Sequence, residues 1–177
     1  MSFRELIKSD FLAYNNSKSF LKEYFHTRGL RITFWLRLTQ YARQKNKLLY
    51  YPVRFIYGRI SRKYGVHIPI AVPVGKALKI FHGFGLVVNS LSIIGEHVIL
   101  QHEVTLAGNG KGAPVIGDHV KLMPGCKIIG KVKIGNNVIV GANSVVTKDV
   151  PDNAVVAGIP SRILYFVDEQ GNKLPTG

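Results

Sequence analysis

Residues 134–163, IGNNVIVGANSVVTKDVPDNAVVAGIPSRI, carry an aliphatic residue at every sixth place, beginning at Ile134 and continuing through Val140 and Val146. The same spacing can be followed backwards along the chain as far as Ile68. The complete register is Ile68, Val74, Ile80, Val88, Ile94, Leu100, Leu106, Ile116, Leu122, Ile128, Ile134, Val140 and Val146. A period of six is typical of a parallel β-helix, in which each short strand buries an aliphatic side chain against its copy in the next coil.

Two longer steps interrupt this register. Eight residues separate Ile80 from Val88, and ten separate Leu106 from Ile116. We interpret both as loops or widened corners inserted between strands. A β-sandwich is a poor alternative, because its strands alternate with a period of two and would not repeat at six.

The first 64 residues follow a different pattern. Apolar residues recur at spacings of three and four, which predicts three or four short helices with breaks at Asn16 and Ser17, at 26–29 and at 44–47. This segment holds 14 Lys and Arg against three acids, whereas residues 65–177 hold 10 against seven. We therefore expect a basic helical segment (1–64), a mainly β domain (65–164) and a C-terminal tail (165–177).

Composition excludes several classes of protein. A single cysteine, Cys126, rules out an internal disulfide framework, and no apolar stretch approaches the roughly 20 residues of a membrane-spanning helix. The charged start MSFRELIKSDF lacks the apolar core of a signal peptide, so we expect a cytoplasmic protein. The histidines fall on different predicted faces without metal-ligand spacing, so no metal site is expected. The aromatic-rich basic helices do not resemble a nucleic-acid-binding tail.

Two stretches resemble the hexapeptide-repeat acyltransferases: residues 134–163, and residues 80–108, IFHGFGLVVNSLSIIGEHVILQHEVTLAG. The second is similar to the branch that contains serine O-acetyltransferases and bacterial polysaccharide O-acetyltransferases. The resemblance covers about residues 65–164. It implies a left-handed β-helix with three sides, assembly as a homotrimer, acetyl-CoA as co-substrate, and an active site between neighbouring protomers.

His82 is the predicted general base. It matches the family's catalytic histidine in a His-x-x-Gly motif, and an imidazole with a pKa near 6.5 can accept a hydroxyl proton at neutral pH. If three hexapeptides form one turn, His102 lies at the matching position of the next coil. Strands in neighbouring coils lie about 4.8 Å apart, so both rings could serve one site.

The chain departs from serine acetyltransferases at two places. Those enzymes carry an aspartate fifteen residues before the catalytic histidine, where this chain has His67. A neutral His67 can accept a hydrogen bond from His82 but cannot stabilise its charged form as a carboxylate does. We therefore expect either an acid such as Glu103 to serve, or the reaction to run without an orienting carboxylate. The Arg-His pair that binds substrate in those enzymes is also absent from the loop GNGKGAP, residues 108–114. Both differences favour an acceptor other than serine.

The predicted acetyl-CoA site combines small residues at a prism edge, a flexible loop and cations for the phosphates. Its residues are Gly108, Lys111, Gly125, Gly141, Ala142, Lys148 and Arg162.

The function expected from the sequence is transfer of acetyl from acetyl-CoA to a sugar hydroxyl of a capsular polysaccharide, an exopolysaccharide or its lipid-linked precursor. Serine O-acetylation for cysteine biosynthesis is one alternative, and a catalytically silent trimeric scaffold is another. The basic helices suggest peripheral contact with an anionic membrane at the inner face of the plasma membrane.

Overall fold

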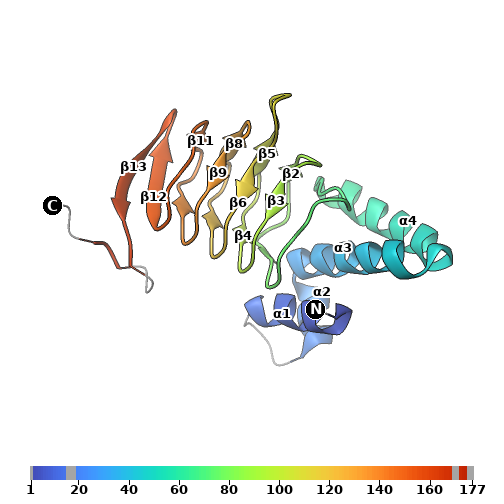
Figure 1. Cartoon of the computed structure of the whole chain (residues 1–177). Coiled ribbons are helices and arrows are strands. Elements are labelled where there is room, and N and C mark those ends of the chain that lie inside the picture. Colours follow the sequence, from blue (N-terminus) through green and yellow to red (C-terminus); the bar gives the residue numbers. More distant parts are fainter. Residues whose placement is uncertain (1, 15–18, 169–171, 175–177) are drawn as a thin grey trace.

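The computed structural model describes residues 2–14, 19–168 and 172–174, with helices at one end and a stack of short strands at the other (Figure 1). The expected break at Asn16 and Ser17 lies outside these residues. The helices are α1 (Phe3–Tyr14), α2 (Phe20–His26), α3 (Arg28–Lys45) and α4 (Lys47–Tyr64). Two of them reach 18 residues, so they are longer than the short helices expected.

Side chains and glycine set the limits of the helices. The Ser19 hydroxyl accepts from the backbone N–H of Lys22 before α2, and the Asn46 side chain accepts two backbone N–H groups at the start of α4. Gly65 ends α4 in the left-handed conformation, with φ at 60°, where glycine has no steric penalty. None of the described helices is long and apolar enough to cross a bilayer.

After Gly65 the chain winds into three parallel sheets whose strands succeed one another in turn. The prediction of a mainly β chain with a parallel β-helix of hexapeptide repeats and a few N-terminal helices is confirmed. The strands are β1 (Lys79–Ile80), β2 (Val87–Val88), β3 (Ile93–Ile94), β4 (Ile99–Leu100), β5 (Thr105–Ala107), β6 (Val115–Ile116), β7 (Lys121–Leu122), β8 (Lys127–Ile129), β9 (Lys133–Ile134), β10 (Ile139–Val140), β11 (Val145–Val146), β12 (Ala154–Gly158) and β13 (Ser161–Phe166).

The register explains why a period of six produces this coil. Ile80 pairs with Leu100, Leu100 with Leu122, and Leu122 with Val140 in successive turns. All four side chains are completely buried, which removes each from water at a gain of about 1.5–3 kcal/mol. Lys79, the strand neighbour of Ile80, faces outward, whereas Leu78 just before the strand is buried and adds to the same core.

Polar side chains form a ladder at one corner of the coil. The backbone N–H of Glu96 donates to Asp118 at 2.7 Å, that of Asp118 to Asn136 at 2.9 Å, and that of Asn136 to Asp152 at 2.7 Å. Each side chain therefore satisfies a backbone donor of the preceding coil, which fixes the spacing of the coils at a bend where no strand pairing does so.

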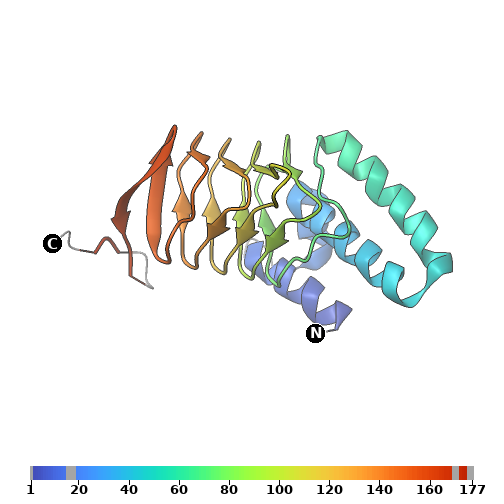
Figure 2. The ribbon, with the colours of Figure 1, turned by 45° about the horizontal axis from the view of Figure 1, so that its top comes forward.

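The helices close the first coil. Ile32 and Leu36 of α3 join the same hydrophobic core as the strands. Arg37 and Asp10 form a buried ion pair at 2.9 Å, and Asp10 also accepts from the backbone N–H of Leu78. At the opposite end β12 turns back into β13 as an antiparallel hairpin. Figure 2 shows α3 and α4 extending away from the coil at the end far from β13.

Candidate functional site

His82 lies at a widened corner between β1 and β2. The two extra residues of the step from Ile80 to Val88 are absorbed there, because both ends keep their register with the next coil. His82 has a φ of 60°, a left-handed conformation that is uncommon for a residue with a Cβ. Its side chain is exposed. The same conformation recurs at other corners of the coil, among them His97 and Glu103, so it belongs to the bend and does not by itself mark His82.

The corner is held by close packing beneath it. Gly83 is buried, and a Cβ at this position would come within 2.7 Å of the Ile32 side chain. A larger residue would therefore push the corner away from α3. The helical segment thus fixes the backbone that carries His82.

His102 lies beside His82 in the next coil. The two ring centroids are 6.0 Å apart and the planes meet at 72°, an edge-to-face arrangement. The Nδ1 atom of His102 is buried and has no hydrogen-bond partner within the part of the chain that the structure describes. The pair therefore consists of one accessible imidazole and one that packs against it from the coil.

No carboxylate orients His82 within the described residues. The Glu103 side chain is exposed, and only its backbone is held, with its N–H donating to the carbonyl of Phe84 at 2.8 Å. Glu103 forms neither a hydrogen bond nor an ion pair with either imidazole in that part of the chain.

His67 occupies a different place from the one expected. Its backbone forms a parallel β-bridge with Val87 of β2. Its exposed side chain lines two surface pockets. One pocket lies under α4, and the other runs along β2 and β5 to Gly108. Among the described contacts of His67, none is with His82.

Cys126 lies in the coil below His102. Burial raises the pKa of its thiol to about 12. A thiol with this pKa is almost wholly protonated at neutral pH, so Cys126 is unsuited to act as a nucleophile. The accessible imidazole of His82 is the better-placed reactive group.

Several residues predicted to bind acetyl-CoA share the corner of His82. The backbone N–H of Gly125 donates to the carbonyl of His102 at 3.0 Å, and Gly141 and Ala142 occupy the same corner in the following coil. Gly125 has a φ of 70°, and a Cβ there would come within 2.1 Å of the Asn143 side chain. Glycine at this position leaves room for the Asn143 side chain of the next coil.

Arg162 extends the same edge toward the C-terminus. It pairs with Ala157 across the β12–β13 hairpin, and a Cβ at Gly141 would come within 2.9 Å of the Ala157 methyl group. The Arg162 side chain is exposed. From β1 to β12 there are four strand spacings of about 4.8 Å, or about 19 Å in all.

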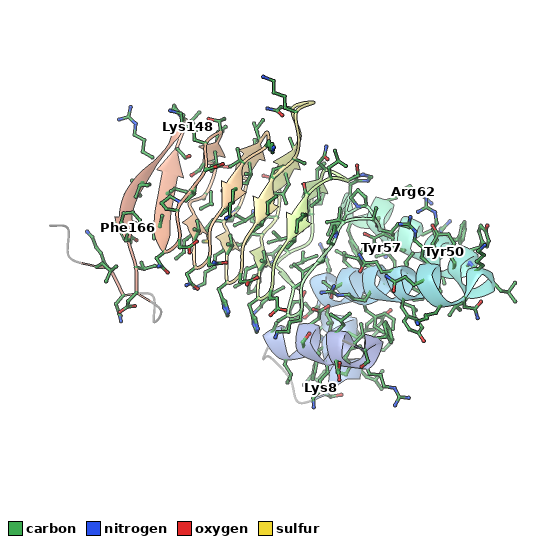
Figure 3. The ribbon with its side chains drawn as sticks, in the orientation of Figure 1. Lys8, Tyr50, Tyr57, Arg62, Lys148 and Phe166 are labelled. Carbon is green, nitrogen blue, oxygen red and sulfur yellow. The ribbon has the colours of Figure 1, made fainter. Side chains whose placement is uncertain are left out.

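The remaining predicted residues lie at another edge. Gly108 and Lys111 belong to the loop after β5, which the backbone N–H of Asn109 closes by donating to the carbonyl of Gly112 at 3.2 Å. Lys148 follows β11 of the same sheet and is exposed (Figure 3). The predicted site is therefore split between two edges of one protomer, separated by the outer face of β2, β5, β8 and β11.

A metal site is not formed by the described residues, which contain no group of three or more His, Cys, Asp or Glu able to hold an ion. His97 and His119 stack with centroids 4.6 Å apart at a different corner from His82.

Two features of the site could not be predicted from the sequence. The buried Nδ1 of His102 depends on packing between coils, and the pocket under α4 depends on where that helix returns to the coil.

Residues 113–148 match the bacterial transferase hexapeptide family (six repeats). The chain is 36% identical to serine acetyltransferase 4 of Arabidopsis thaliana over 163 residues, covering 90% of this chain and 44% of that protein. It is 39% identical to serine acetyltransferase of Staphylococcus epidermidis over 145 residues, covering 79% and 66% of the two chains. It therefore spans from under half to about two thirds of the length of these relatives.

The structural comparison gives the same kinship. Serine acetyltransferase in complex with coenzyme A from Brucella abortus strain S19 superposes with a TM-score of 0.82 at 28% identity. The match covers 94% of this chain and 69% of that one.

These comparisons correct the expected acceptor. The polysaccharide or sugar hydroxyl predicted from the sequence is wrong, because the relatives by sequence and by structure are serine acetyltransferases. His67 in place of an aspartate and the missing Arg-His pair are local differences, and similarity over most of the chain outweighs them.

Proposed function

We propose that this chain, a hexapeptide-repeat acyltransferase with a parallel β-helix, transfers the acetyl group of acetyl-CoA to the hydroxyl of serine. The observation that carries the proposal is the 36% identity with a serine acetyltransferase over 90% of the chain. The accessible imidazole of His82, at the widened corner between β1 and β2, supplies a group suited to the reaction.

In the proposed reaction His82 takes the hydroxyl proton of serine while the oxygen attacks the thioester carbonyl. The carbon–sulfur bond then breaks, and His82 returns the proton to the departing thiolate, which leaves as free CoA. His102 packs against the side of the His82 ring and limits its rotation. Glu103 is not assigned a part, because its carboxylate reaches neither ring among the described residues.

The edge of small residues from Gly125 to Ala142 suits the pantetheine arm of acetyl-CoA, which needs room and backbone partners. Arg162 at the far end of this edge can bind two phosphate oxygens at once. Its position on the same edge as His82 supports the assignment. Gly141 is half-buried and Ala142 is exposed, so these two small residues offer the accessible part of the edge to the co-substrate.

We infer a homotrimer with sites between protomers. Exposed aliphatic side chains on the outer faces of the coil, among them Val87 and Ile93 at 43% and 45% exposure, support an interface. In such an assembly one protomer supplies the edge of His82 and its neighbour the loop of Gly108 and Lys111. Light scattering after size exclusion tests this, and a mass near that of a single 19.7 kDa chain contradicts it.

Acetyl transfer is tested by thiol release from acetyl-CoA with L-serine, with a panel of sugars and with no acceptor. The expected result is release that depends on serine and is lost in His82→Ala. Release with sugars alone contradicts serine as the acceptor. Absence of release with every acceptor supports the alternative of a silent scaffold.

Cytoplasmic location and peripheral contact with an anionic membrane are a separate part of the proposal. Its support is that α3 and α4 contain no Asp or Glu, while Leu48, Tyr51 and Phe55 of α4 are exposed. Salt-sensitive sedimentation with vesicles that contain phosphatidylglycerol is expected. Equal recovery with neutral vesicles at low salt contradicts it.

A further inference from the structure

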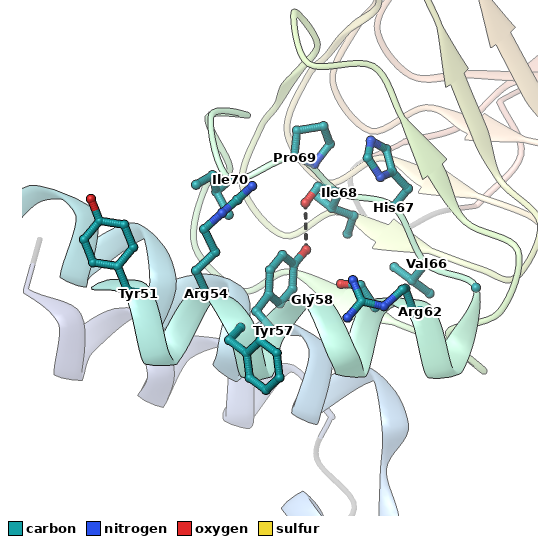
Figure 4. Close-up of a pocket in the computed structure, with 13 residues that line it drawn as sticks. Tyr51, Arg54, Tyr57, Gly58, Arg62, Val66, His67, Ile68, Pro69 and Ile70 are labelled. Carbon is teal, nitrogen blue, oxygen red and sulfur yellow. Dashed lines mark hydrogen bonds between the residues drawn. The ribbon is translucent and has the colours of Figure 1, made fainter. Parts of the chain in front are cut away.

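A pocket of about 640 Å³ lies between α4 and the segment that follows it (Figure 4). It is distinct from the edge proposed for acetyl-CoA. It is lined by Tyr51, Arg54, Phe55, Tyr57, Gly58, Ser61, Arg62, Gly65, Val66, His67, Ile68, Pro69 and Ile70.

The pocket is lined by two positively charged side chains and by no acidic one. Arg54 and Arg62 project from the same helix, and no Asp or Glu is among the lining residues. Neither guanidinium forms an ion pair with a carboxylate in residues 2–14, 19–168 or 172–174; the ion pairs there involve Arg37 and Lys76. Two arginines without an acidic partner favour an anion, since each can donate two parallel hydrogen bonds to phosphate or carboxylate oxygens.

Gly58 leaves the floor of the pocket open. It lies within α4, where glycine costs helix stability relative to alanine. Packing does not require it, because a Cβ at this position would meet only the Arg62 guanidinium, at 3.5 Å. The missing side chain therefore lets the Arg62 guanidinium lie over the helix backbone at Gly58, on the same helix as Arg54 (Figure 4).

The back wall is rigid and the rim is aromatic. The Tyr57 hydroxyl donates to the carbonyl of Ile68 at 2.7 Å, which ties the helix to the segment that follows it. Tyr51 and Phe55 are 71% and 62% exposed at the rim. Exposed rings of this size offer a flat apolar surface to a ligand that enters the pocket.

We propose that this pocket binds a small phosphate ester that carries an apolar or aromatic group. Arg54 and Arg62 hold the phosphate over Gly58, and Tyr51 and Phe55 contact the apolar group. The proposal goes beyond acetyl transfer and does not depend on it. A bound ester would reach His67, whose side chain lines this pocket and the one that extends to Gly108.

Isothermal titration calorimetry with phenyl phosphate, without acetyl-CoA, tests the proposal on the full chain. Phenyl phosphate is expected to bind, and phenol much more weakly. Arg54→Ala and Arg62→Ala should each weaken binding by about tenfold or more. Lys63→Ala is the matched control, because Lys63 is an exposed cation of the same helix that does not line this pocket.

A second pair of variants tests the space itself. Gly58→Leu should abolish binding by filling the floor of the pocket. Gly58→Ala should keep most of the binding and a helical circular dichroism spectrum.

Competition with phosphatidylcholine vesicles, with and without phosphatidylglycerol, tests whether the natural phosphate ester is a lipid headgroup or a soluble molecule. Displacement by the anionic vesicles supports a lipid headgroup, and no displacement supports a soluble ester.

Three outcomes overturn the proposal. They are no binding of phenyl phosphate at millimolar concentration, equal affinity for phenol, and equal weakening by Lys63→Ala and Arg54→Ala. Because binding is measured without acetyl-CoA, each of them leaves the proposal of serine acetylation intact.

Discussion

The ring of His82 meets the ring of His102 edge to face, with centroids 6.0 Å apart and planes at 72°. His82 is the accessible member of the pair, so we predict that His82→Ala lowers kcat/KM for acetyl transfer to serine by about 10²–10⁴-fold. Initial rates of thiol release measure the effect. His97→Ala is the control, because His97 lies at another corner and should keep the rate. An unchanged rate in the His82 variant contradicts its role as the base.

We predict that His102 acts through His82 rather than on the substrate. Replacing it with alanine frees the His82 ring to rotate, and we predict a fall in kcat of about ten- to a hundredfold with little change in KM for acetyl-CoA. A pH–rate profile separates positioning from simple loss of structure, since the apparent pKa of the base should shift in the variant. A profile identical to that of the wild-type chain, with unchanged kcat, contradicts this assignment.

The corner that carries His82 and His102 could be predicted because period six specifies which side chains face inward and the family resemblance implies three hexapeptides per turn. Ile80, Leu100, Leu122 and Val140 stack as the register requires, and the eight-residue step forms a widened corner. The hydrophobic effect acts on every coil alike, so one spacing determines the whole stack. The handedness and the assembly were expectations from resemblance and not from spacing.

Contacts between the helices and the coil could not be predicted from the spacing of apolar residues. Helical periodicity predicts which face of α3 is apolar, but it does not indicate that Arg37 meets Asp10 or that both reach the first coil. His67 shows the same limit. It stands where serine acetyltransferases carry an aspartate, and that resemblance suggested a contact with His82; within one protomer its side chain lines the pocket under α4. The identity of the acetyl acceptor was inferred from similarity to known proteins and not from the spacing of residues.

The ion pair between Asp10 and Arg37 is buried at both side chains. Arg37 also donates to the carbonyl of Val74 at 2.7 Å, so the pair joins α1 and α3 to the coil. We predict that Asp10→Ala lowers the free energy of unfolding by about 3–5 kcal/mol, because it leaves a buried guanidinium without its carboxylate. Urea denaturation measures the loss.

The exposed ion pair between Lys76 and Glu96, at 3.0 Å, is the matched control for that experiment. Glu96→Ala should cost no more than about 1 kcal/mol, since both side chains are in contact with water. An equal loss of unfolding free energy in Asp10→Ala and Glu96→Ala would mean that burial does not strengthen the ion pair between Asp10 and Arg37.

Cys126 should be inert in the folded chain. Burial raises the pKa of its thiol to about 12, while an ordinary cysteine titrates near pH 8.5. We predict that a disulfide reagent at pH 8 labels the chain in denaturant within seconds but labels the native chain only as fast as the coil opens. Because the thiol takes no part in the proposed transfer, brief treatment with the reagent should also leave serine acetylation unchanged. Rapid labelling of the native chain with loss of activity would place a reactive thiol beside His102 and would require a covalent route in place of direct attack by the serine hydroxyl.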